Sequence, residues 1–188
     1  MIASQDRSYF IGASDCDKVI GNWKTATWIK WWSQKIGINT DHFTNVYTLA
    51  GTHFEHRILE SLGILMEFDK QFINEELRLR VNLDGNTEDC IYECKTTKDN
   101  INEFKLPKKY INQVQVQMYG SGIRNANIVV YQLEEEDYKN FFRPIDSRRL
   151  KVFPVEYDSK WVEKVYFPKH LILRDCLVKG VLPDEALV

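Results

Sequence analysis

The spacing of apolar residues changes abruptly near residue 64, and this change constrains the fold more than any other feature of the chain. Before it, apolar side chains recur at roughly helical spacing, and after it they alternate as in half-buried strands. Ser14 is the expected N-cap of the first helix, and Thr25 opens the second. The expected helices cover residues 15–20, 25–35, 44–62, 108–120 and 159–178, and the expected strands cover residues 65–73, 77–83, 90–96, 126–133 and 152–156.

This order of elements predicts an α/β protein of α+β-like type, with a central mixed sheet flanked by helices. The strand over residues 152–156 should lie at an edge. No Gly/Ser linker, repeat or low-complexity segment interrupts the chain, so residues 1–188 are expected to form one domain. The longest apolar stretches fall far short of the ~18 residues of a membrane span, and the N-terminal sequence lacks the pattern of a secretory signal. We therefore expect a cytoplasmic protein without a membrane segment.

Charge and cysteine usage narrow the classes of function. The formal net charge of −2 argues against a protein that coats nucleic acid. It is compatible with an enzyme that binds a few phosphates through a local basic patch and metal ions. The four cysteines show no C-x-x-C pair and no matching His/Cys pair at zinc-site spacing, so we interpret them as reduced thiols rather than zinc ligands. They are Cys16, Cys90, Cys94 and Cys176.

The segment IYECKTTK, residues 91–98, places an acidic and a basic side chain in one predicted strand. Glu93 and Lys95 are two residues apart and should point to the same face. The ordinary interpretation is a solvated surface ion pair. The alternative interpretation is a metal-dependent phosphodiesterase site, which would need Asp84 as well. Asp84 followed by Gly85 also suits a hairpin turn over residues 85–89.

If Asp84 faces Glu93 across the hairpin, two carboxylates lie together, and their repulsion costs free energy unless a cation joins them. A hard divalent ion, Mg²⁺ or Mn²⁺, has the right ligand preference. Lys95 could then polarise a water and stabilise the charge that develops at phosphorus during phosphodiester hydrolysis.

Two helices add further candidates. Glu55 lies in the middle of a predicted helix, where it could reach the same metal ion or could pair with Lys or Arg at the surface. Tyr110, Gln113 and Gln117 share one face of a later helix. Amides buried on that face would need a phosphate or a water as partner, whereas exposed ones would simply be solvated.

At the N-terminal end, Ser14 precedes a predicted helix, and the backbone N–H groups there could bind an anion. Arg7 could close such a pocket. Lysines within residues 95–109 offer a basic rim for a phosphate backbone. The tryptophans within residues 23–32 could stack on bases, but we interpret them as core residues.

Five short motifs occur in an order that is typical of a known nuclease family. They are R-x(6)-S within RSYFIGASD, G-x(3)-E within GTHFE, LDG, ECK, and Y-x(2)-Q within YINQVQVQMY. Over about residues 7–133 the chain resembles the lambda-exonuclease branch, the YqaJ-type viral recombinases, of the PD-(D/E)xK nuclease superfamily. The resemblance implies a restriction-endonuclease-like core with a central mixed sheet.

The resemblance also implies the metal-binding and catalytic residues. Asp84 and Glu93 would bind the catalytic metal ions, Mg²⁺ with Mn²⁺ as a substitute, together with the backbone carbonyl of Cys94. Lys95 would assist the nucleophilic water. Glu55 would support a second metal ion or orient water.

For the DNA end, the resemblance implies a separate set of residues. Tyr110 and Gln113 would lie near the scissile or terminal phosphate, and Arg7 and Ser14 would hold the 5′-terminal phosphate. The family often has Ser where this chain has Asn82, and Pro before the catalytic Asp, which is absent here. An amide can still donate a hydrogen bond to phosphate, so we assign Asn82 to the same pocket.

Members of the family degrade one strand of linear double-stranded DNA from its end, 5′ to 3′, often beside a single-strand annealing protein and as a ring-shaped trimer. The resemblance therefore implies a phage-type DNA exonuclease. Two alternatives stay open on the same core: a structure- or sequence-specific endonuclease, and a non-catalytic DNA-end-binding protein. The intact Asp84, Glu93 and Lys95 argue against the second alternative.

Overall fold

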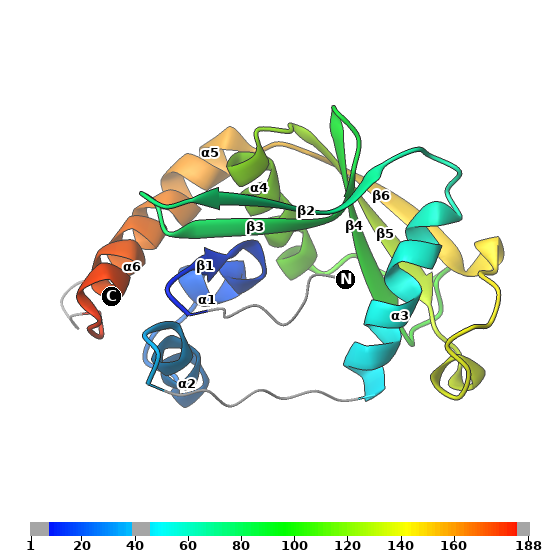
Figure 1. Ribbon diagram of the computed structural model, residues 1–188, viewed down its shortest axis with the longest axis horizontal. Coiled ribbons are helices and arrows are strands. Elements are labelled where there is room, and N and C mark those ends of the chain that lie inside the picture. Colours follow the sequence, from blue (N-terminus) through cyan, green and yellow to red (C-terminus); the bar gives the residue numbers. More distant parts are fainter. Residues whose placement is uncertain (1–7, 39–45, 184–188) are drawn as a thin grey trace.

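The computed structural model describes residues 8–38 and 46–183, with side chains described except at residues 46–48. Six strands form one mixed sheet with helices packed around it (Figure 1). The strands are β1 (Ile11–Gly12), β2 (Glu67–Asn74), β3 (Leu79–Asn86), β4 (Cys90–Thr97), β5 (Asn125–Gln132) and β6 (Leu150–Glu156). The α-helices are α1 (Cys16–Ile20), α2 (Ala26–Lys35), α3 (Val46–Glu60), α4 (Lys108–Ser121), α5 (Ser159–Trp161) and α6 (Phe167–Lys179).

The sheet is organised around β3. This strand pairs antiparallel with β2 from end to end, while its other edge is shared between two strands. β1 pairs in parallel with Leu79 and Arg80, and β4 pairs antiparallel with Gly85 and Asn86. Within the described residues, no strand pairs with the middle of this edge, residues 81–84. The sheet is therefore open between β1 and β4, and the site described below lies at this opening.

The remaining strands extend the sheet from β4. β5 runs parallel to β4, and β6 runs antiparallel to β5. Among the described strands, β6 pairs with β5 alone, which confirms the predicted edge strand. Parallel pairing of β4 with β5 requires a crossover, and α4 provides it.

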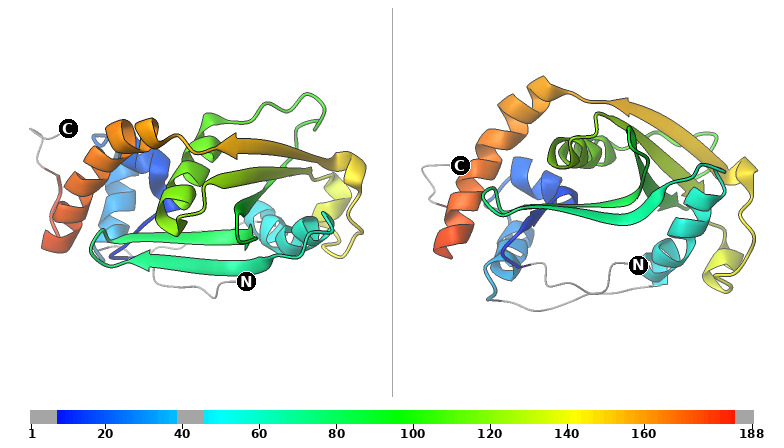
Figure 2. Two further views of the ribbon diagram at one scale, coloured as in Figure 1. Left: turned by 90° about the horizontal axis from the view of Figure 1, so that it is seen from above. Right: turned by 45° about the horizontal axis from the view of Figure 1, so that its top comes forward.

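Two helices cover opposite faces of β4 and β5. α3 packs through Phe54 against Tyr131, and α4 packs through Val114 against Ile128. Tyr131 and Ile128 are an odd number of residues apart on β5, so they point to opposite faces. The sheet curves around α4, with the β2–β3 hairpin on one side of this helix and β5–β6 on the other (Figure 2).

A second part of the core is rich in tryptophan and joins α1, α2 and α6. Trp28 stacks on Trp32 with ring centroids 5.4 Å apart and on Trp23 at 5.7 Å, and all three side chains are buried. Trp31 is half-buried and donates its indole N–H to Asp15 at 2.9 Å. The prediction that these tryptophans are core residues is confirmed, because Trp23, Trp28 and Trp32 are buried and Trp31 packs against Trp28 and Trp32.

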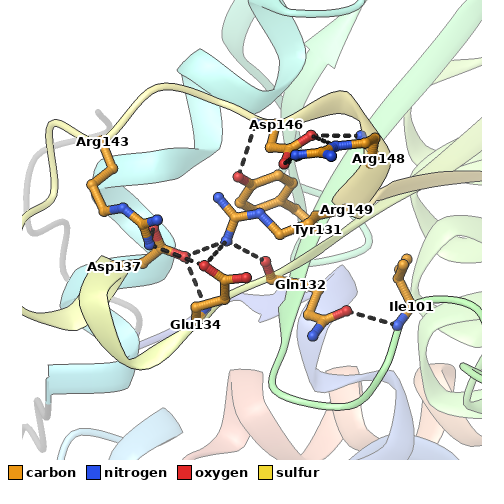
Figure 3. Close-up of polar contacts among 9 residues, drawn as sticks. All are labelled: Ile101, Tyr131, Gln132, Glu134, Asp137, Arg143, Asp146, Arg148 and Arg149. Carbon is orange, nitrogen blue, oxygen red and sulfur yellow. Dashed lines mark hydrogen bonds and ion pairs between the residues drawn. The ribbon is translucent and has the colours of Figure 1, made fainter.

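Buried charges hold the connection between β5 and β6 (Figure 3). Asp137 is fully buried and accepts hydrogen bonds from Arg143 at 2.9 Å and from Arg149 at 2.6 Å. Arg149 also donates to the main-chain carbonyl of Gln132 at 3.2 Å. These contacts fold residues 133–149 back onto the end of the sheet.

Most predicted elements are confirmed, with ends that differ by a few residues. The predicted start of the third helix at residue 44 lies outside the described residues. The sequence does not predict β1, because two residues carry no periodic pattern. The predicted last helix contains a π-helical segment, Val162–Tyr166, between α5 and α6. No helix within residues 8–38 and 46–183 is both long and apolar enough to cross a membrane.

Two local predictions are wrong. Ser14 is not an N-cap: it lies inside a short 3₁₀ helix whose N-cap is Gly12, and the carboxylate of Asp15 accepts the Gly12 N–H at 2.8 Å. The β3–β4 turn begins after Asn86 rather than at Gly85, because Gly85 still pairs with neighbouring strands. A side chain at Gly85 would meet the Met66 sulfur at 2.6 Å, so this glycine serves a close approach rather than a turn.

Candidate active site

A cleft of about 300 Å³ lies where β3 and β4 separate. It is lined by residues of β2, β3, β4, α2, α3 and α4, and by the segment that leads into α1. A wider depression of about 540 Å³ lies beside Leu65 and Glu88 and contains none of the predicted site residues. The predicted residues that line the cleft are Ser14, Glu55, Asn82, Asp84, Glu93, Cys94, Lys95 and Gln113.

Glu93 is buried in the wall of this cleft and is 1% exposed. Its Oε1 accepts hydrogen bonds from Lys95 Nζ at 2.6 Å and from Gln113 Nε2 at 2.5 Å. Its Oε2 accepts a hydrogen bond from Gln117 Nε2 at 2.5 Å. The predicted shared faces of the strand and of the helix are therefore confirmed. Because Glu93 is buried, the interpretation as a solvated surface ion pair is wrong.

Asp84 and Glu93 directly adjoin the last paired residues of β3 and β4. Asp84 Oδ2 accepts the N–H of Cys94 at 2.8 Å. Removal from solvent raises the pKa of Asp84 well above its ordinary value, and the carboxylates of Glu93 and Glu55 raise it further. Burial likewise raises the pKa of Glu55, with Glu93 as the next cause. Three carboxyl groups thus lie close enough to repel one another, and two of them are disfavoured as anions by burial.

Lys95 pairs directly with Glu93, with its Nζ 2.6 Å from Oε1. Burial by itself lowers the pKa of an ammonium, but the attraction of Glu93 and Asp84 outweighs burial, so the pKa of Lys95 is raised above its ordinary value. Its Nζ also lies 5.4 Å from the centre of the Tyr110 ring, which packs beside it. Lys95 therefore stays charged at neutral pH.

The donor set of the cleft fits a hard divalent cation. Carboxylate oxygens are the ligands that Mg²⁺ and Mn²⁺ prefer, and the raised pKa values of Asp84 and Glu55 mean that a positive partner would favour their ionised forms. Cys94 can contribute its carbonyl, because the N–H and C=O of one strand residue point to the same side and its N–H points to Asp84. Burial raises the pKa of the Cys94 thiol well above its ordinary value, so the thiol stays neutral.

The residues predicted to bind the DNA end are only partly brought together. Ser14 is exposed in the lining of the cleft, and Asn82 lies in the same lining. Asn82 Oδ1 accepts a hydrogen bond from Gln71 Nε2 at 2.8 Å, which turns the donor side of its amide away from Gln71. Tyr110 lies beside Lys95 and outside the lining. Arg7 lies outside the described residues.

Sequence reasoning missed several residues of the lining: Lys35, Thr52, Asp69 and Arg80. Arg80 stands four residues before Asp84 on β3, an even spacing that was a usable signal. Lys35 is buried and pairs with Asp15 at 2.6 Å, although it follows an apolar helix face that predicts no buried cation.

The sequence around Asp69 gives no signal that this residue lines the cleft. Its φ of 57° lies in the left-handed region, which an alternating strand pattern does not predict. Its Oδ2 lies 3.2 Å from His56 Nε2, and one ligand atom each from Glu55, His56 and Asp69 lie within 4.8 Å of one another.

Comparison with known proteins gives one family and a set of similar structures. The family described as the YqaJ-like viral recombinase domain matches residues 4–124. No curated protein matches the chain. A crystal structure of LHK-Exo in complex with dAMP has a TM-score of 0.72 at 18% identity and covers 92% of this chain and 90% of its own.

Two further structures show the same likeness. The alkaline exonuclease LHK-Exo from Laribacter hongkongensis has a TM-score of 0.71 at 17% identity, with 92% of this chain and 90% of that chain covered. A phage-related exonuclease from Haemophilus somnus has a TM-score of 0.61 at 16% identity, with 90% and 95% covered. At such low identity these likenesses show the fold. The six-stranded mixed sheet flanked by helices is that of PD-(D/E)xK-type exonucleases, as predicted.

Proposed function

The chain belongs to the YqaJ-like viral recombinase family, and from this premise we propose that it is a metal-dependent exonuclease that degrades linear double-stranded DNA from its 5′ ends. The observation that carries the proposal is the arrangement around Glu93. A buried carboxylate that is bound to Lys95 and Gln113 lies next to the carboxyl groups of Asp84 and Glu55. This arrangement is costly for a folded protein unless it binds a cation.

Asp84, Glu93, Glu55 and the carbonyl of Cys94 would hold the metal ion. When bound, a divalent metal ion lowers the pKa of a water molecule and neutralises charge on the phosphate that is attacked. The N–H of Cys94 donates to Oδ2 of Asp84 and so orients this carboxyl. Mg²⁺ is the proposed ion, with Mn²⁺ as a substitute.

Lys95 is proposed to act on the nucleophile and on the phosphate. Its ammonium stays charged and can donate a hydrogen bond to the attacking water while Glu93 orients it. It can also stabilise the negative charge that grows on the phosphate oxygens in the transition state. Gln113 donates to Glu93 and lines the cleft, and its proposed role is to orient Glu93 and to contact the scissile phosphate.

The 5′ polarity is proposed to depend on a phosphate subsite in the same cleft. Ser14 and the amide of Asn82 would donate hydrogen bonds to a 5′-terminal phosphate, with Arg7 as the third member. Release of mononucleotides is the expected outcome, and LHK-Exo, which has a similar fold, was crystallised with dAMP. By the family resemblance, a single-strand annealing protein is the proposed partner and a ring-shaped trimer the proposed assembly.

Digestion of a linear duplex that is labelled at its 5′ or 3′ ends tests the proposal. We expect 5′-phosphorylated duplexes to lose mononucleotides from their 5′ ends in Mg²⁺ and to stay intact in EDTA. Duplexes with 5′-hydroxyl ends should be degraded more slowly, and Ser14→Ala should remove this preference. Gel filtration of the same protein checks the trimer.

Two controls separate this proposal from its alternatives. Asp84→Asn should abolish digestion, whereas Glu75→Gln, at an exposed carboxylate that pairs with Arg78, should not change it. Cleavage of covalently closed circular DNA in Mg²⁺ would show an endonuclease instead. Binding of DNA ends without any digestion in Mg²⁺ or Mn²⁺ would show a non-catalytic end-binding protein.

A further inference from the structure

Gln117 occupies an unusual position for an amide. It lies on α4, is 1% exposed, and follows the buried apolar residues Val114 and Val116 and precedes Met118. Its Nε2 donates two hydrogen bonds, to Glu93 Oε2 at 2.5 Å and to the main-chain carbonyl of Asn82 at 2.9 Å. Both N–H groups of the amide are therefore used.

These two acceptors belong to strands that have separated. The backbone pairing of β3 with β4 ends at Gly85 and Tyr92, immediately before Asp84 and Glu93 are reached. Beyond that point the carbonyl of Asn82 on β3 has no backbone partner on β4. The amide of Gln117 bridges the two strands there, because it donates to Asn82 O on β3 and to Glu93 Oε2 on β4 where backbone hydrogen bonds between the strands have ended.

The amide is retained at a cost. Gln117 Oε1 is buried and finds no hydrogen-bond partner in the part of the chain that the structure describes. A buried polar atom left without a partner destabilises a protein, and a methionine of similar length would avoid this. A polar side chain that is buried at such a cost is expected where function requires it.

The hydrogen bonds to Glu93 leave room for one more partner. An ionised carboxylate offers roughly four lone-pair directions. Lys95 and Gln113 occupy two on Oε1, and Gln117 occupies one on Oε2. These hydrogen bonds fix both oxygens of the carboxylate. Oε2, which accepts only from Gln117, can still accept one more partner.

We propose that Gln117 is a positioning residue that fixes Oε2 of Glu93, and the distance between β3 and β4, so that Glu93 can bind a divalent metal ion. This inference rests on the proposed function, because it assumes that Glu93 is a metal ligand. Hydrogen bonds to a ligand carboxylate preserve its orientation, and their loss typically weakens metal affinity by about 10- to 100-fold.

The test is Mn²⁺ binding to the full chain without DNA, measured by isothermal titration calorimetry and by the electron paramagnetic resonance signal of free Mn²⁺. Gln117→Met removes the amide and keeps the length of the side chain. Gln115→Met is the matched control, because Gln115 is a buried glutamine of the same helix that binds Glu156 O and Asp158 N instead. We expect Mn²⁺ affinity to fall about 10-fold or more in Gln117→Met and to stay unchanged in Gln115→Met.

A purely structural role would give a different result. In that case both variants would lower the thermal midpoint, and neither would change Mn²⁺ affinity, which would overturn the inference. In DNA digestion, Gln117→Met should need more Mn²⁺ for half-maximal rate and should recover most of the rate at saturating Mn²⁺. If Gln117→Met does not fold, Gln117→Asn keeps an amide that is one methylene too short to reach Glu93. Wild-type Mn²⁺ affinity in a folded Gln117→Asn protein would equally overturn the inference.

Failure of the proposed function is distinguishable from failure of this inference. If the wild-type chain binds no Mn²⁺, or if Glu93→Gln binds it as tightly as the wild type, the metal site itself is wrong. If Glu93→Gln loses Mn²⁺ while the Gln117 variants bind normally, the metal site stands and only the role of Gln117 is wrong.

Discussion

Lys95 is the single residue that contacts the carboxylate of Glu93 and is also proposed to act on the attacking water and the phosphate. It pairs with Glu93 at 2.6 Å while 21% of its side chain remains exposed in the lining of the cleft. Its charge is held by Glu93 and Asp84 against the effect of burial. A lysine in this setting can act on a phosphate without giving up its proton.

Lys95→Ala should therefore lower the turnover of a 5′-phosphorylated linear duplex by about 100-fold or more, because transition-state charge loses its partner. Mn²⁺ binding should persist, since removal of the ammonium leaves the carboxylates more attractive to a cation. Steady-state digestion rates and calorimetric titration measure both effects. Lys70→Ala, at an exposed pair with Glu67, is the control and should digest DNA normally. Full activity of Lys95→Ala would contradict the catalytic assignment.

His170 is a buried histidine outside the lining of the cleft, and burial keeps its ring neutral at pH 7. Its Nε2 lies 2.9 Å from the carbonyl of Leu77, so Nε2 carries the proton, and Nδ1 accepts from the Tyr166 hydroxyl at 3.0 Å. The ring is fully buried, and burial lowers its pKa to about 4. The unfolded chain takes up this proton near pH 6.5 and the folded chain only near pH 4, so stability is lost as pH falls through this window.

We expect the free energy of unfolding to fall by about 2 kcal/mol between pH 7.5 and pH 5 through His170 alone. Urea unfolding of wild type and His170→Gln at both pH values measures this contribution as the difference in their pH dependence. His53→Gln, at an exposed histidine that stacks on Phe141, should keep the wild-type dependence. Equal pH dependence in wild type and His170→Gln would show that the ring is not neutral in the folded protein.

At the scale of elements, the connection between β5 and β6 depends on one buried carboxylate (Figure 3). Asp137 pairs with Arg149, whose side chain is 11% exposed, and it also accepts the N–H of Glu134 at 2.8 Å. Removal of Asp137 would leave the Arg149 charge buried beside the more exposed Glu134 at 3.5 Å.

Asp137→Asn should lower the free energy of unfolding by about 3 kcal/mol, because one partner of a buried ion pair is lost. Asp146→Asn, which removes the partner of the exposed Arg148, should leave the urea midpoint nearly unchanged. Urea unfolding of the two variants gives the comparison. Similar midpoints for both variants would mean that the Asp137 pair contributes no more than a surface pair.

At the scale of the whole molecule, the cleft lies between two parts of the core. The tryptophan-rich part around α1, α2 and α6 supplies the segment with Ser14, and the part under α3 supplies Glu55. The fold thus brings together groups whose mutual repulsion opposes folding. Metal binding and stability should be coupled, because a ligand that binds only the folded chain stabilises it.

We expect Mn²⁺ at 100 times its dissociation constant to raise the free energy of unfolding by about 2.7 kcal/mol. Asp84→Asn should raise the thermal midpoint of the metal-free protein, because an uncharged amide replaces a carboxyl that burial and its neighbours disfavour in the ionised form. The same variant should lose the Mn²⁺ effect. Scanning calorimetry in EDTA and in Mn²⁺ measures both changes, and an unchanged Mn²⁺ effect in Asp84→Asn would rule out this carboxyl as a ligand.

Local pattern was sufficient for most of the helices and strands and for the shared faces that carry the candidate site. Alternation along β4 predicted that Glu93 and Lys95 share a face, and helical spacing predicted that Gln113 and Gln117 share another. Both predictions depend only on the periods of strand and helix. They hold because the packing of β4, β5 and α4 preserves those periods.

Other features depend on contacts between distant segments, which no local pattern encodes. β1 exists only because Ile11 and Gly12 meet β3, and the buried charge of Lys35 depends on Asp15 and on the carbonyl of Phe10. The left-handed backbone of Asp69 is likewise not visible in an alternating strand.

The periods of apolar residues along the chain thus predict the helices, the strands and a mixed sheet, and they indicate the carboxylates and the lysine of the candidate site. Only the packing of distant segments buries Glu93, separates β3 from β4 beside it and brings Gln117 across the opening. Periodicity shows which side chains of one helix or strand share a face. The distances between side chains of different elements, and their removal from water, arise only when the helices pack on the sheet.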